Sequence, residues 1–110
     1  MPSFNAAIIQ MNSTPDSPAE IVSQLENRLA GLPDGLSLVI LPELWTVSGF
    51  DETLPGKASC SPEILRKLSE WARTRLCAVH CGSLPWKENG RLYNRTFFVG
   101  ETGTTLSTYD

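Results

Sequence analysis

The arrangement of apolar and polar residues divides the chain into short strands and two amphipathic helices. Residues 6–9 and 36–41 are apolar at nearly every position, which is typical of strands that are covered on both faces. Between them, Ile21, Leu25 and Leu29 recur at the spacing of one face of a helix. This strand, helix and strand predict two parallel strands joined by a right-handed crossover.

Both predicted helices begin at a Ser-Pro pair. Ser17 is a good cap, Pro18 suits the first helical position, and Glu20 follows three residues after the cap. Residues 61–63 (Ser-Pro-Glu) repeat this start, and a stripe centred on Leu68 follows them. The stripe consists of Leu65, Leu68 and Ala72, with Ile64 and Trp71 at its edges.

The last third of the chain contains only strand and turn patterns. Residues 76–82 predict a third strand, and residues 89–90 (Asn-Gly) predict a turn between two extended stretches. Residues 92–99 and 104–109 predict two more strands, separated by a turn at residues 100–103. The predicted order is β-α-β-α-β-β-β, which indicates a layered α/β domain whose later strands form hairpins.

Composition excludes several classes of protein. The chain has 110 residues, 41% of them hydrophobic and 19% charged, as expected for one globular domain or part of one. The nine basic residues are scattered and the net charge is -3, so we expect no nucleic-acid partner. No apolar run approaches the roughly 20 residues of a membrane helix, and the first residues do not resemble a signal peptide. Three cysteines without a framework favour reduced thiols and a cytoplasmic protein.

Glu43 is the strongest candidate for chemistry. It follows residues 38–42, so it lies just past the carboxyl end of a buried strand, where open α/β sheets bind ligands. The apolar neighbours Leu44, Trp45 and Val47 predict partial desolvation, which strengthens a carboxylate as a general base. Two structural roles stay open: Glu43 caps a turn, or it pairs with an arginine. Of the three tryptophans, Trp45 is the one placed to line a pocket.

The cysteines and the single histidine suggest two other sites. Cys60 precedes a helix start, where a thiol can become more acidic, but a partly exposed loop thiol is the simpler interpretation. Cys77, His80 and Cys81 are metal-ligand residue types. Strand alternation directs His80 away from the two thiols, however, so we expect buried structural cysteines, a hydrogen-bonded core histidine and no metal.

The residues around Glu43 resemble a known motif. The stretch Leu41-Pro42-Glu43-Leu44-Trp45, followed by Ser48-Gly49-Phe50, is similar to the glutamate motif of the nitrilase superfamily of carbon–nitrogen hydrolases, and residues 44–50 resemble its omega-amidase-like branch. Four further segments occur in the family's order. They are residues 6–10, which end in Gln10, Gly82-Ser83, Tyr93-Asn94, and Gly103 with Tyr109-Asp110.

The resemblance implies a fold and a reaction. The fold would be the N-terminal half of an α-β-β-α sandwich, with residues 1–110 an incomplete portion of the hydrolase domain. The reaction would convert a small carboxamide to a carboxylate and ammonia without a cofactor, in a homo-oligomer. Members use a Glu-Lys-Cys triad, in which Glu43 would be the catalytic glutamate; Trp45 and Asn94 would be candidates for the substrate pocket.

The chain departs from the family in one respect. The resemblance places the lysine directly after Asp110 and the cysteine further on, while Lys57 and Lys67 fall in a loop and on a helix. We therefore expect the 110 residues to be inactive alone. The alternative hypothesis is a non-catalytic fragment or binding module that associates with itself or with a separate C-terminal half.

Overall fold

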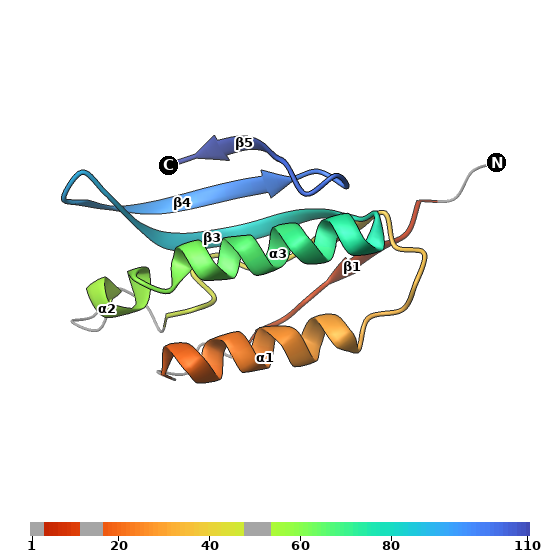
Figure 1. Cartoon of the computed structure of the whole chain (residues 1–110), viewed down its shortest axis with the longest axis horizontal. Helices are drawn as coiled ribbons and strands as arrows, with labels where there is room; N and C mark the ends of the chain where they lie inside the picture. Colours follow the sequence, from red (N-terminus) through yellow and green to blue (C-terminus); the bar gives the residue numbers. More distant parts are fainter. Residues whose placement is uncertain (1–3, 12–16, 48–53) are drawn as a thin grey trace.

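The structure is a computed structural model that describes residues 4–11, 17–47 and 54–110 (Figure 1). Its elements, in chain order, are β1 (Ala6–Ile8), α1 (Pro18–Ala30), β2 (Leu38–Ile40), α2 (Leu54–Ala58), α3 (Ser61–Arg75), β3 (Ala78–Glu88), β4 (Arg91–Val99) and β5 (Thr105–Tyr109). The predicted order of strands and helices is confirmed, with the short helix α2 as an addition. Among the described residues, no helix is long and apolar enough to cross a membrane.

The strands form one sheet in the order β1-β2-β3-β4-β5. β1, β2 and β3 are parallel to one another, whereas β4 is antiparallel to β3 and β5 is antiparallel to β4. Figure 1 shows α1 and α3 running alongside each other, and an ion pair between Glu26 and Lys67 joins them at 2.7 Å. The parallel crossovers and the later hairpins therefore agree with the sequence pattern.

The two faces of the sheet have different surroundings. Val39, Val79 and Val99 lie in one row across β2, β3 and β4, and each is 0% exposed in the core beneath α1 and α3. In the next row, Ile8 is paired with Ile40 and is 79% exposed. Because successive side chains of a strand point to opposite faces, the second row belongs to a face that α1 and α3 leave uncovered. The prediction that these strands are covered on both faces was therefore wrong for β1, whose Ala6 and Ile8 are exposed.

Both long helices begin where the sequence predicts, but only one has the predicted cap. The Oγ of Ser17 accepts a hydrogen bond from the Glu20 N–H at 3.3 Å, as the capping pattern predicts. Helix α3 also begins at the predicted place, but its N-cap is Cys60, and Ser61 lies inside the helix. The hydroxyl of Ser61 donates instead to the Pro85 carbonyl of β3 at 2.6 Å. A tertiary contact thus takes the hydroxyl that the local pattern assigns to the cap.

Two details differ from the prediction. Helix α2 was missed, since Pro55 and Gly56 are poor helix formers, and the predicted loop residue Lys57 lies within it. Strand β3 begins at Ala78 and continues to Glu88, past the predicted end at residue 82. Leu76, predicted to open that strand, is the left-handed C-cap of α3 with φ 52°.

Candidate active site

Glu43 stands in a tight turn at the end of β2, and β3 holds this turn in place. The N–H of Leu44 donates to the Ser83 Oγ at 2.9 Å, and the N–H of Ser83 donates to the Pro42 carbonyl at 3.3 Å. Leu44 has a φ of 44°, which is uncommon for a residue with a side chain. Such strain is characteristic of functional sites and persists only where neighbouring contacts hold it. The carboxylate of Glu43 therefore projects from a backbone with little freedom.

Gly82 allows β3 to approach this turn. A Cβ at position 82 would lie 1.9 Å from the Pro42 carbonyl oxygen, and the φ of Gly82 is +64°. The register of β3 against β4 shifts between His80 and Ser83, which marks a bulge. Bulges often redirect side chains beside active sites. The Gly82-Ser83 motif thus has a physical basis: glycine permits the close approach and serine ties the turn.

A cavity of about 420 Å³ opens beside Glu43. The end of β2, the bulged part of β3, and strands β4 and β5 contribute to its wall. The polar lining residues are Glu43, His80, Ser83, Asn94, Thr96, Tyr109 and Asp110. A space of this size matches a small-molecule site, and it lies at the sheet edge where the sequence pattern predicts a ligand.

Glu43 and Asn94 meet at this cavity although they lie 51 positions apart in the sequence. The Asn94 Nδ2 donates to the Glu43 Oε1 at 2.9 Å. Among the described atoms, the Oδ1 of Asn94 is buried without a hydrogen-bond partner. The amide nitrogen therefore orients the carboxylate, and the amide oxygen is a buried acceptor without a partner among the described residues.

The desolvation expected for Glu43 is not seen among the described residues. Glu43 is exposed, whereas its apolar neighbours Leu44, Trp45 and Val47 are buried. The turn directs these neighbours inward and the carboxylate outward. Apolar neighbours in sequence thus did not become neighbours of the carboxylate in space.

Trp45 does not occupy the position that the sequence suggests. Its side chain is 3% exposed, packs in the core and donates through Nε1 to the Cys81 carbonyl at 3.1 Å. It is absent from the cavity wall among the described residues. Trp45 follows the left-handed residue Leu44, and its side chain lies in the core. Its hydrogen bond to Cys81 links the turn to β3. The motif residues Ser48-Gly49-Phe50 lie outside the described residues.

The alternative site at Cys77, His80 and Cys81 is not assembled. Both cysteines are buried in the core, and burial raises the pKa of the Cys81 thiol to about 12. His80 faces the other side of the sheet, where its Nδ1 accepts the Gly82 N–H at 3.2 Å. No group of three or more His, Cys, Asp or Glu residues suited to a metal occurs in the described part of the chain.

His80 is half-buried on the cavity wall, so its expected place in the core was wrong. A signal for this position was present in the sequence. Val79 and Cys81 are apolar, so strand alternation places His80 on the opposite face of the sheet. There it is paired with Ile40, which precedes Glu43 by three residues.

Burial also alters the third cysteine. Cys60 is 7% exposed, so the expectation of a partly exposed thiol was wrong. Its thiol donates to the Lys57 carbonyl at 2.9 Å, and burial raises the pKa of the thiol. The thiol is therefore held in its protonated form, opposite to the acidic thiol that a helix N-terminus can produce.

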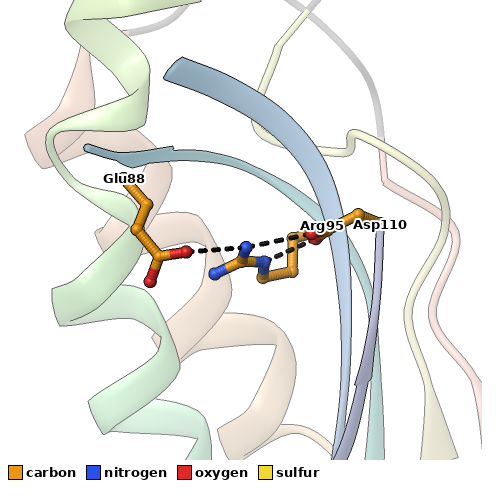
Figure 2. A network of polar contacts seen from close by, with 3 residues as sticks. All are labelled: Glu88, Arg95 and Asp110. Atoms are coloured by element: carbon orange, nitrogen blue, oxygen red, sulfur yellow. Dashed lines mark hydrogen bonds and ion pairs between the residues drawn. The ribbon is translucent and has the colours of Figure 1, made fainter. Parts of the chain in front are cut away.

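A network of charges that the sequence did not predict lies at the end of β5 (Figure 2). The Arg95 Nε donates to the Asp110 Oδ1 at 2.5 Å, and its Nη2 donates to the Asp110 Oδ2 at 3.0 Å. The same Nη2 donates to the Glu88 Oε2 at 3.0 Å. The hydrogen bonds from Arg95 hold the pKa of the Asp110 carboxyl below its usual range.

Comparison with known proteins identifies the family of the chain. The sequence profile of the carbon-nitrogen hydrolase family matches residues 5–110, and the chain belongs to that family. The chain is 30% identical over 112 residues to the omega-amidase NIT2 of Homo sapiens, covering 99% of this chain and 40% of that protein. It is 31% identical over 97 residues to the 2-oxoglutaramate amidase of Paenarthrobacter nicotinovorans, covering 77% of this chain and 33% of that protein. The resemblance to omega-amidases is thereby confirmed.

Solved structures show the same fold. A CN-hydrolase superfamily protein from Xanthomonas campestris matches with a TM-score of 0.78 at 22% identity, over 94% of this chain and 39% of that chain. An amidase from Nesterenkonia sp. matches with a TM-score of 0.73 at 20% identity, over 96% of this chain and 41% of that chain. The α/β fold of nitrilase-superfamily proteins is therefore confirmed. The chain spans 33% to 41% of the length of these proteins.

Proposed function

We propose that this chain provides the glutamate of an amidase site that hydrolyses a small carboxamide to a carboxylate and ammonia, without a cofactor. One observation carries the proposal: the Asn94 amide and a strained, cross-tied turn hold the Glu43 carboxylate at the mouth of the cavity. The family and the similarity to amidases support the reaction class. We propose 2-oxoglutaramate as the first substrate to test, because a relative is named for it.

The chemistry requires a thiol and an amine besides the carboxylate. Glu43 would accept the proton of a cysteine thiol while the cysteine sulfur forms a bond to the amide carbon. It would return that proton to the nitrogen, so that the C–N bond breaks and ammonia leaves. Water would then hydrolyse the thioester to the carboxylate and restore the thiol. A lysine would stabilise the negative oxygen of each tetrahedral intermediate.

Of the carboxylate, the thiol and the amine, the described residues supply only the carboxylate at the cavity. No lysine or cysteine is among the described residues of its wall. Lys67 pairs with Glu26 on the helical side of the sheet, and Lys57 is buried in α2. We therefore propose that residues 1–110 are the N-terminal portion of a hydrolase domain and that the thiol and the amine come from another part of the protein.

The coding DNA beyond Asp110 tests this proposal. A lysine codon directly after Asp110, then a cysteine motif in the same or a shifted frame, is the expected result. In the enzyme that includes these residues, Glu43→Gln should reduce kcat for 2-oxoglutaramate by about 10²- to 10⁴-fold. Glu101→Gln makes the same chemical change in the turn before β5 and serves as the control. Equal activity of the two variants would remove Glu43 from the mechanism.

A second candidate function is a non-catalytic module that associates with itself or with a separate C-terminal half. The uncovered sheet face favours this candidate, since Ile8 on β1 and Tyr109 on β5 are 79% and 78% exposed. The purified 110-residue chain should release no ammonia from small amides. Ammonia release by a mass-verified preparation would contradict both this candidate and the need for outside groups. Because its three cysteines are free, we also propose a cytoplasmic location for this protein.

A further inference from the structure

Asn94 and Arg95 are consecutive residues of β4, and each bonds a carboxylate at the cavity. Asn94 donates to Glu43 just past β2, and Arg95 donates to Asp110 just past β5. Consecutive residues of a strand point to opposite faces of the sheet. The side chains of Asn94 and Arg95 therefore leave β4 on different faces, although Asp110 lines the same cavity as Asn94 and Glu43.

The contact between Arg95 and Asp110 has the geometry of a strong ion pair. Two parallel N–H···O bonds join the guanidinium to both carboxylate oxygens (Figure 2). The Nη2 that binds Asp110 also donates to the Glu88 Oε2, and the guanidinium carbon lies 5.0 Å from the centre of the Tyr93 ring. The Arg95 side chain is only 14% exposed. Such bidentate pairs fix orientation as well as distance.

Strand β5 needs a tether of this kind. It lies at the edge of the sheet, and all five of its residues are exposed. Its pairing with β4 shifts register near Val99 and ends at the pair Thr96 and Tyr109. The end of an exposed edge strand with little packing frays readily. Arg95 contacts the chain directly after this last pair.

We propose that Arg95 is a positioning residue that holds the end of β5 at the rim of the Glu43 cavity, independently of the Asn94 contact that holds Glu43. The inference rests on the proposed function, because position matters only if the chain after β5 takes part in the reaction. Under that function, Asn94 sets the place of the base, and Arg95 sets the place from which the next residue enters the site.

NMR on the 110-residue chain tests the two contacts separately. The measurements are the side-chain carboxyl carbon signals of Glu43 and Asp110, and the backbone order parameter of Tyr109. In Arg95→Gln, the Tyr109 order parameter should fall from about 0.85 to below about 0.6, while the Glu43 signal stays unchanged. In Asn94→Ala, the Glu43 signal should shift, while Asp110 and Tyr109 stay unchanged.

Three further variants complete the design. Arg91→Gln removes a charge from the exposed end of β4 and should leave all signals as they are. Arg95→Lys keeps the charge without the planar fork, so the Asp110 carboxyl should still titrate below its usual range while Tyr109 becomes mobile. Asp110→Asn removes the same ion pair from its exposed side and should release Tyr109 even if Arg95→Gln fails to fold.

A rigid Tyr109 in both Arg95→Gln and Asp110→Asn would overturn the inference. So would a Glu43 signal that shifts in Arg95→Gln as it does in Asn94→Ala, since the contacts would then not be independent. Neither measurement involves catalysis. If the enzyme that includes these residues releases no ammonia from amides, the proposed function fails, and the Arg95 contact is unaffected. If Tyr109 stays rigid, the inference on Arg95 fails, and the proposed function is unaffected.

Discussion

Gly82 is the residue at which two backbone segments come closest beside the cavity. We expect Gly82→Ala to lower the free energy of unfolding by about 2–4 kcal/mol or to prevent folding, through its clash with the Pro42 carbonyl and its positive φ. Gly35 has a φ of +80° but nothing within 4 Å of an added Cβ. Gly35→Ala should therefore cost only about 1 kcal/mol. Urea denaturation followed by circular dichroism compares them, and equal losses would remove the role of the close contact.

Cys81 should make stability depend on alkaline pH. Burial raises the pKa of its thiol from 9.0 to about 12, so the unfolded chain releases this proton at lower pH than the folded chain. Its contribution to stability is complete below pH 9 and is lost as the pH rises from 9 towards 12. The unfolding free energy should thus fall less steeply above pH 9 in Cys81→Ala than in the natural chain. Parallel slopes would contradict the burial argument.

At the scale of the element, a helix cap and a core side chain should contribute differently to stability. The cap of α1 is one hydrogen bond at an exposed end, so Ser17→Ala should cost about 0.5–2 kcal/mol. Leu68 of α3 is 0% exposed in the core, and Leu68→Ala should cost about 2–5 kcal/mol through the cavity it leaves. Chemical denaturation of both variants measures the difference. A larger loss for Ser17→Ala would show that the core beneath α3 is loosely packed.

The elements also show how far local pattern extends. The helices beginning at Pro18 and Ser61 were predictable, because a cap, a proline and an apolar stripe act within a few residues. Helix α2 was not predictable, since Pro55 and Gly56 oppose a helix locally. Trp45 was misplaced for a similar reason. Its direction depends on the Leu44 turn, which the Ser83 hydroxyl of a distant strand stabilises.

At the scale of the whole molecule, the sheet has one covered and one uncovered face. Ile8 of the uncovered face is 79% exposed, so Ile8→Lys should change the unfolding free energy by no more than about 0.5 kcal/mol. The same variant should reduce binding of a hydrophobic dye and self-association measured by light scattering, because it breaks an exposed apolar patch. Val79→Lys on the covered face is the contrast and should prevent folding. A natural chain that is monomeric and binds no dye would contradict this description of the face.

The amino-acid sequence by itself determined the local features of this protein. The starts of α1 and α3, the positions and order of the strands, and a carboxylate past the end of β2 depend on residues close together in the chain, so their pattern is visible before folding. Tertiary structure alone decided the rest: the pairing of Asn94 with Glu43, the contact of Arg95 with Asp110, and the exposure of Glu43. These features depend on strand register, on the bulge in β3 and on the close approach at Gly82. Each arises between segments far apart in the chain, where no local pattern specifies which side chains will meet.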